Sequence, residues 1–158
     1  LRRLDDALGG FFTKPIGSDE DVMRMYLLLQ VIEERAVTQF PIFKDAIAKH
    51  DPESAKVFAE IEKDEEGHLK YCQAIARRYA PSPEVHDATL LEFRTVEAKV
   101  FAQNSNRNLI HALKIGLLRG NLFVRAMWWG VAAFAKVVDP SRPTPFATAQ
   151  LQPVLAHA

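Results

Sequence analysis

Cysteine is almost absent from the sequence, which contains Cys72 alone among its 158 residues. An intrachain disulfide is therefore excluded, which is compatible with a reducing compartment. The N-terminal residues also lack the apolar core of a secretory signal and include Gly9, Gly10 and Pro15. We therefore expect a cytoplasmic protein.

An excess of charge of either sign is absent too, because 20 acidic residues balance 20 basic ones. Surfaces that bind nucleic acid usually carry a basic excess, so we expect no nucleic-acid partner. Long apolar runs are missing as well. The longest uncharged run late in the chain, 126–135, has about half the length that a transmembrane helix needs. The length and overall composition are typical of one globular domain over residues 1–158.

Signals for the ends of helices are frequent, whereas the alternation typical of strands is not seen. Ser18 precedes three acidic residues, and Asp51 and Ser82 each precede a proline, as at helix N-termini. These signals predict the following segments: a helical hairpin at 19–79 with helices at about 19–49 and 52–79, further helices over 84–138, and an irregular tail at 139–158.

Two positions leave the helix boundaries open. Pro41 lies inside the first long helix and must either kink it or split it. The third helical region either turns at 104–107 or continues to a break at 120–121. The connections are short, so neighbouring helices should run antiparallel in an all-α bundle.

Each helix of the predicted hairpin has an apolar stripe that is interrupted by polar residues at mid-length. The stripe of the first helix advances in steps of three and four through Val22, Tyr26, Leu29, Glu33, Ala36, Phe40, Phe43 and Ile47. The stripe of the second helix consists of Phe58, Ile61, Glu65, His68, Cys72, Ile75 and Tyr79. Residues at this spacing face a partner helix.

The polar positions of the two stripes should meet. Glu33 and Glu65 are equally far in sequence from the tip expected near residue 49, and His68 follows Glu65 by three residues on one helix face. Carboxylates in an apolar interface are costly unless a cation compensates them. Two carboxylates and an imidazole suit iron or manganese. Alternatively, the three side chains lie at a partly exposed rim and bond to one another or to an arginine.

This pattern resembles one half of a rubrerythrin-like protein of the ferritin-like superfamily. The resemblance covers roughly residues 20–80 and depends on Glu33 with Ala36 and Phe40, and on the Asp-Glu-x-x-His run that ends at His68. It implies a ferritin-like antiparallel four-helix bundle with an additional C-terminal helix or tail. It also implies two iron ions per site and the chemistry of a diiron oxidoreductase or ferroxidase. The second ring nitrogen of His68 should meet an acceptor such as Asp64 or Glu34.

The sequence departs from the family because no second Glu-x-x-His follows. Glu97 and His111 are the nearest substitutes, and they come level only if the chain turns at 104–107. We therefore consider three arrangements: Glu97 and His111 complete the metal site, two chains pair their hairpins in a homodimer, or the site binds one metal or none.

The segment 117–138, within the last third of the chain, is apolar and contains Trp128 and Trp129. We favour a core helix of the bundle. The alternative is a helix that lies on a membrane surface. The second reading of function is accordingly a metal-free ferritin-like helical interaction or membrane-peripheral protein.

Overall fold

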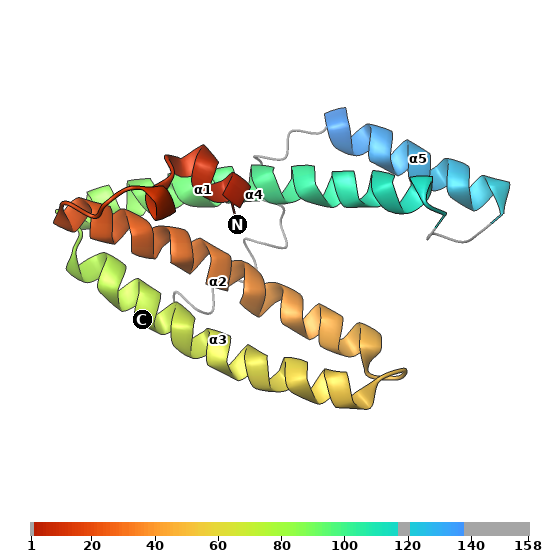
Figure 1. The fold of residues 1–158 in the computed structure, drawn as a ribbon, viewed down its shortest axis with the longest axis horizontal. Coiled ribbons are helices and arrows are strands. Elements are labelled where there is room, and N and C mark those ends of the chain that lie inside the picture. The colour runs from red at the N-terminus through yellow and green to blue at the C-terminus, as the bar shows by residue number, and fades with distance from the viewer. Residues whose placement is uncertain (1, 117–120, 138–158) are drawn as a thin grey trace. The chain divides into compact units, whose positions relative to one another are not determined.

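The computed structural model describes residues 2–116 and 121–137, and this part of the chain is helical and contains no strand (Figure 1). The all-α prediction is confirmed. The elements are α1 (Arg2–Leu8), the short 3-10 helix η1 (Phe11–Thr13), α2 (Asp19–Ile47), α3 (Pro52–Arg78), α4 (Pro83–Lys114) and α5 (Leu122–Val137).

The capping signals act as the sequence predicts. The Ser18 hydroxyl accepts a hydrogen bond from the backbone N–H of Asp21 at 3.1 Å and so caps α2. The Asp51 carboxylate accepts one from the backbone N–H of Ser54 at 3.0 Å and caps α3. Asn121 in the same way accepts a hydrogen bond from the backbone N–H of Val124 at 3.0 Å, at the start of α5.

Two of the open boundaries are now decided. α2 continues through Pro41 as one helix, so the split that we considered there is wrong. α4 runs unbroken through 104–107, so the turn considered there is wrong as well. The end of α4 is instead followed by Gly116, whose φ of 71° lies in the left-handed region that favours glycine at helix ends. The predicted tail at 139–158 lies outside the described residues.

The chain divides into two compact units, one ending at Arg94 and the other beginning at Thr95. In the first unit, α2 and α3 pack along their length as an antiparallel hairpin (Figure 1). The Phe58 ring lies 5.8 Å from Phe40 and 6.2 Å from Phe43, between ring centroids. The Tyr26 and Tyr71 rings meet edge-on at 5.7 Å. The Phe58 contacts join members of the two predicted stripes, whereas Tyr71 lies outside the stripe predicted for the second helix.

The most buried face of α2 lies beside this stripe rather than on it. Its members are Met23, Leu27, Leu28, Gln30, Val31 and Glu34. They are covered because the start of α4 and the N-terminal segment pack against a second side of α2. The Arg24 guanidinium, for example, lies 5.4 Å from the Phe11 ring centroid and 5.1 Å from that of Phe93. Helix α2 therefore has two packed sides.

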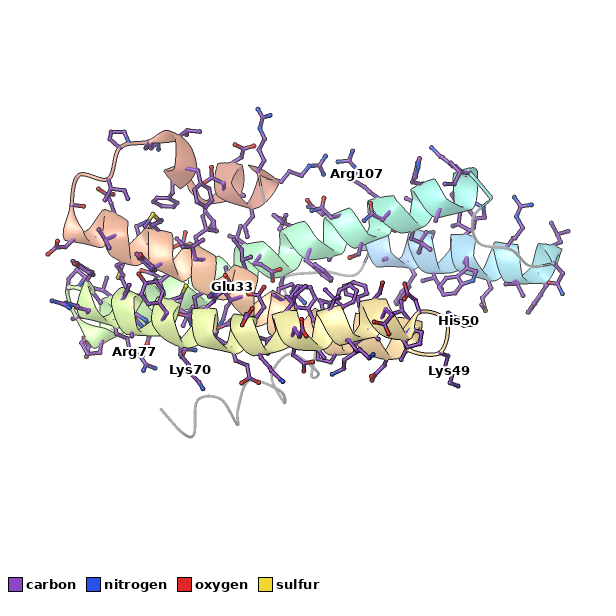
Figure 2. All side chains as sticks on the ribbon, turned by 60° about the horizontal axis from the view of Figure 1, so that its bottom comes forward. Glu33, Lys49, His50, Lys70, Arg77 and Arg107 are labelled. Carbon is purple, nitrogen blue, oxygen red and sulfur yellow. The ribbon has the colours of Figure 1, made fainter. Side chains whose placement is uncertain are left out.

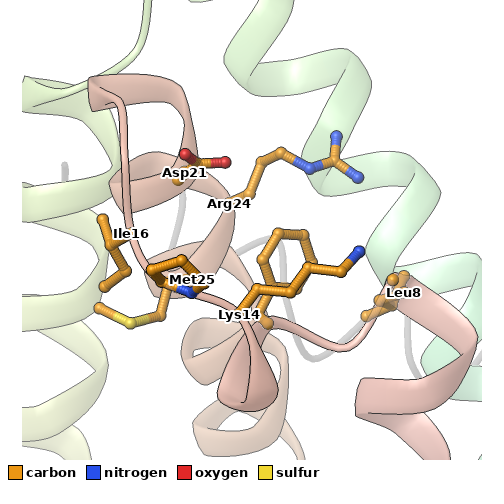
Figure 3. A pocket seen from close by; sticks show the side chains of 9 residues that line it. Leu8, Lys14, Ile16, Asp21, Arg24 and Met25 are labelled. Atoms are coloured by element: carbon orange, nitrogen blue, oxygen red, sulfur yellow. The ribbon is translucent and has the colours of Figure 1, made fainter.

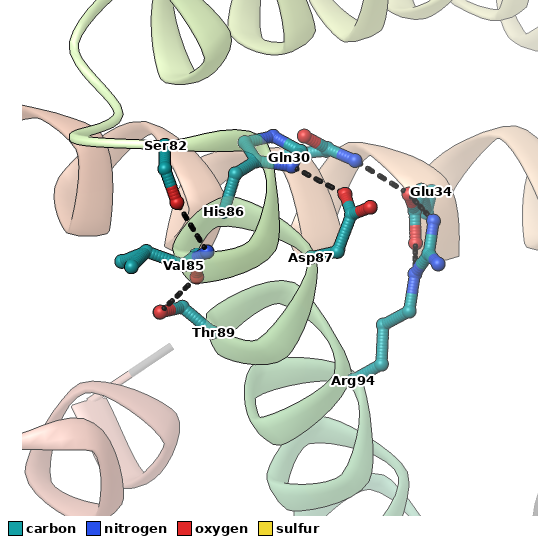
Figure 4. A network of polar contacts seen from close by, with 8 residues as sticks. All are labelled: Gln30, Glu34, Ser82, Val85, His86, Asp87, Thr89 and Arg94. Atoms are coloured by element: carbon teal, nitrogen blue, oxygen red, sulfur yellow. Dashed lines mark hydrogen bonds and ion pairs between the residues drawn. The ribbon is translucent and has the colours of Figure 1, made fainter.

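An ion pair holds the start of α4 to α2 (Figure 4). The Arg94 guanidinium donates to both carboxylate oxygens of Glu34, at 2.6 and 2.8 Å, and the Gln30 amide donates to the same carboxylate at 2.9 Å. His86 is also buried here, with its Nδ1 atom 2.8 Å from the Asp87 carboxylate. The fork of an arginine matches both oxygens of a carboxylate, which makes this a well-satisfied buried charge.

In the second unit, α5 buries little of its own surface. Ala132 is buried, whereas six large apolar side chains of α5 are exposed. They are Leu122, Phe123, Met127, Trp129, Val131 and Phe134. The described part of this segment is thus helical, as expected, but leaves most of its large apolar side chains exposed. No helix among the described residues has the length and hydropathy needed to cross a membrane.

We predict that Arg94→Met lowers the free energy of unfolding by roughly 2–4 kcal/mol, because it leaves the Glu34 carboxylate buried without a counter-charge. The double variant Glu34→Leu with Arg94→Met should recover much of this loss. Denaturant titration followed by circular dichroism measures both effects. Arg77→Met, at an exposed arginine near the end of α3, is the control and should change stability by less than about 0.5 kcal/mol. A loss equal to that of the control would contradict a stabilising role for this ion pair.

Candidate metal centre

Glu33, Glu65 and His68 converge at mid-length of the hairpin, and Figure 2 marks Glu33 between α2 and α3. Each side chain offers one ligand atom, and these three atoms all lie within 4.8 Å of one another. Glu33 comes from α2, whereas Glu65 and His68 come from successive turns of one face of α3. The side chains meet because the interface aligns the mid-points of the two helices.

The site has a sheltered side and an open side. The Glu65 side chain is 17% exposed, whereas that of His68 is 62% exposed. The Nδ1 atom of His68 lies 3.3 Å from a carboxylate oxygen of Glu65. The two carboxyl groups therefore lie deeper in the helix interface, and the imidazole lies at its solvent edge.

The electrostatics of the site centre on Glu33. The pKa of Glu33 is raised from 4.5 to about 7, chiefly by burial and also by a hydrogen bond with the Glu65 carboxyl and by the charge of that group. The charge of His68 acts in the opposite direction. Two carboxyl groups can hydrogen-bond to each other only if they hold a proton between them. Near neutral pH the pair therefore retains a proton at a place where a cation could replace it.

The spacing of the ligand atoms suits a metal ion. Ligand atoms bound at about 2.1 Å lie about 3 Å apart when they are adjacent on an ion and about 4.2 Å apart when they are opposite. The 3.3 Å separation between Glu65 and His68 is close to the adjacent case. All three ligand atoms lie within 4.8 Å of one another, and this value exceeds the distance between ligand atoms on opposite sides of an ion by about half an ångström. Small side-chain rotations can close that difference.

The residues around the centre are not further ligands. Cys72, one turn after His68, is buried, and burial together with the charge of Glu33 raises its pKa to about 11. Its sulfur is not among the three ligand atoms that converge at the centre. The Tyr26 hydroxyl lies 3.3 Å from that of Tyr71, so Tyr26 is a half-buried tyrosine with a bonded hydroxyl.

Other predicted site residues do not join the group. Glu97 and His111 lie on the same unbroken helix, α4, about 21 Å apart by helical rise, and so cannot share an ion. The proposed completion of the site by this pair is wrong. Glu34 is bound by Arg94 and Gln30, so it does not serve as the acceptor for His68. The neighbour of His68 is Glu65.

A separate cavity of about 280 Å³ lies near the N-terminal end of the first unit, with Lys14 and Arg24 as its cations (Figure 3). Asp21 lines the same cavity together with apolar side chains such as Ile16 and Met25. None of the three candidate ligands lines it. The cavity therefore adds nothing to the metal centre.

No protein-family model, curated protein or solved structure matches the chain. The resemblance to ferritin-like proteins thus remains a prediction that depends on the residues quoted for it. The geometry of Glu33, Glu65 and His68 is an independent observation, since it depends on the packing of α2 against α3.

In the metal-free protein, we predict that stability falls as the pH rises from about 4.5 to about 7. Because the pKa of Glu33 is raised in the folded protein, the folded protein holds a proton in this pH range that the unfolded chain has released. A rise in pH therefore favours unfolding. The effect should be roughly 1–2 kcal/mol. The full shift corresponds to about 3.4 kcal/mol, and water reaching the partly exposed pair reduces it.

Glu33→Gln mimics the protonated carboxyl and should remove this pH-dependent component. The variant should match the parent near pH 5 and exceed it by roughly 1–2 kcal/mol near pH 7.5. Chemical denaturation in the presence of a chelator at several pH values measures the difference. Glu66→Gln, at an exposed carboxylate one residue beyond Glu65, should keep the pH profile of the parent. Parallel profiles for the parent and Glu33→Gln would show that the pKa of Glu33 is not raised in the folded protein.

Proposed function

We propose that this chain is a non-haem iron protein of the ferritin-like, diiron-carboxylate type, with an oxidoreductase or iron-handling role. Glu33, Glu65 and His68 are its metal ligands. The observation that carries the proposal is the convergence of two carboxyl groups and an imidazole, from two facing helices, within 4.8 Å. A bound iron ion would supply a one-electron redox couple at this point.

The donor set favours iron, with manganese as the next candidate. Structural zinc sites usually contain thiolates, and none of the three converging ligands is a cysteine. Calcium prefers a shell made wholly of oxygen atoms, which an imidazole does not provide. Two carboxylates with one nitrogen donor match the preferences of ferrous iron and manganese.

Three protein ligands leave an octahedral ion with open positions, and a second copy of the chain could fill them. Two hairpins facing each other would bring together four carboxylates and two imidazoles, which is the ligand composition that the family resemblance implies for a diiron site. The exposed edge at His68 is the side from which a second copy could approach. We therefore propose a homodimer as the form that holds two irons.

Within one chain, the ligands have distinct roles. Glu33 and Glu65 exchange their retained proton for the cation, so that metal binding releases a proton near neutral pH. His68 contributes the nitrogen donor at the solvent edge. The Tyr26–Tyr71 ring contact joins α2 and α3 at the more exposed edge of the interface and contributes to their separation.

We predict that protein purified from iron-supplied cells contains about one iron ion per chain, measured by inductively coupled plasma mass spectrometry. Glu65→Gln should lower the affinity for ferrous iron at least tenfold, because it removes one charged ligand from the site. The matched control Glu66→Gln changes the charge equally on an exposed site of α3 and should retain full occupancy. Light scattering in the presence and absence of iron would show whether the loaded form has twice the mass of one chain.

A different outcome would favour a structural role for these residues. If the chain contains no metal and Glu33→Leu with Glu65→Leu raises the free energy of unfolding, the two carboxylates are only a cost to the interface. That pair of results would overturn the iron site while leaving the helical hairpin intact.

A further inference from the structure

Helix α5 presents a broad apolar surface to solvent. At about 100° per residue, an arc of about 200° from Trp129 through Leu122, Phe123 and Phe134 to Val131 contains no charged residue. The exposed fractions are high, at 84% for Leu122, 77% for Phe123 and 69% for Phe134. Apolar patches of this kind on a protein surface usually mark a binding site.

The charge of this region has one sign. Residues 98–138 contain no aspartate or glutamate and six basic residues: Lys99, Arg107, Lys114, Arg119, Arg125 and Lys136. Residues 1–97 contain 19 acidic and 13 basic residues. The chain has no net charge, but these two segments carry net charges of opposite sign. On α5, Arg125 is exposed and borders the apolar arc next to Trp129. The partner of this surface should therefore be apolar and negatively charged.

We propose that α5 binds peripherally to a lipid surface that contains anionic headgroups. In this arrangement the exposed aromatic and aliphatic side chains enter the boundary between headgroups and acyl chains, and Arg125 at the edge of the arc lies against lipid phosphates. Trp129, at the edge of the arc beside Arg125, occupies the position that tryptophan prefers at a membrane interface.

The length of α5 fixes how it would bind. It has 16 residues, which is fewer than the roughly 20 needed to span a bilayer, and none of the longer described helices is apolar enough to do so. A short helix with an apolar arc and a basic border lies in the plane of the interface instead. The chain would thus be held on one side of the membrane.

Charge also favours lipid over a second copy of α5 as the occupant. Two copies packed through this face would bring together helices that carry basic residues and no acidic ones, which repel each other. An anionic lipid surface attracts each of those residues, and this attraction weakens with added salt.

The chain offers a direct readout, because both of its tryptophans, Trp128 and Trp129, lie in α5. We predict that the full chain sediments with vesicles of 70% phosphatidylcholine and 30% phosphatidylglycerol, and at least tenfold more weakly with phosphatidylcholine alone. Tryptophan fluorescence should shift to shorter wavelength and be quenched by lipids brominated near the headgroup. Raising the salt from 0.1 to 0.5 M should weaken the binding.

Two variants separate the apolar and the charged contributions. Phe123→Ser with Phe134→Ser should lower the vesicle affinity at least tenfold, and Arg125→Glu should lower it about tenfold on the anionic vesicles alone. The control is Phe12→Ser with Ile42→Ser, which removes two exposed apolar side chains from the first unit and should bind as the parent does. Circular dichroism checks that each variant retains its helices.

The proposal is overturned if the tryptophans show no shift and no quenching with anionic vesicles, or if the control pair weakens binding as much as the α5 pair. It is also overturned if light scattering shows a dimer that Phe123→Ser with Phe134→Ser dissociates, since a second copy would then cover α5. The iron site is tested separately, because Glu65→Gln should bind vesicles as the parent does whether or not the chain holds metal.

Discussion

The packing of α2 against α3 forces carboxyl groups into contact at the middle of an apolar interface, and the candidate site depends on this contact. Phe58 between Phe40 and Phe43 fixes the register on one side of Glu33, and the Tyr26–Tyr71 pair fixes it on the other. These contacts hold α2 and α3 in the register that places Glu33 opposite Glu65. Burial of this carboxyl pair is therefore costly unless a proton or a cation compensates its negative charge.

Two adjacent residues of α2 show two ways in which a protein accepts a buried carboxylate. Glu34 is compensated permanently by the guanidinium of Arg94, which occupies both of its oxygens. Glu33 has no arginine in the contacts that define its site, and its charge is relieved by a proton held with Glu65. A guanidinium cannot be exchanged, whereas a proton exchanges rapidly with solvent. The first solution stabilises a fixed fold, and the second leaves a place that a metal cation can enter.

The sequence predicts the hairpin and its three polar residues well because both depend on local rules. Caps at Ser18 and Asp51 determine where helices begin, and the three-four spacing determines which residues face each other. The burial of Gln30 and Glu34 was missed, although they continue the stripe of Met23 and Leu27 at the same spacing. That stripe is buried by the start of α4, a contact between segments distant in sequence, and periodicity alone does not say which of two neighbouring stripes is covered.

The C-terminal part of the chain shows why whole-chain composition is a poor guide to partners. A net charge of zero predicts no affinity for an anionic surface, yet all of the basic excess lies in one acid-free segment and all of the acidic excess precedes it. Electrostatic attraction acts over about 8–10 Å at physiological ionic strength, so a surface senses the local segment and not the total. Apolar content is misleading in the same way, because the hydrophobic residues of α5 resemble a core in sequence but are exposed in the structure. The distribution of charge and exposure along the fold, rather than their sums, therefore determines what this helix can bind.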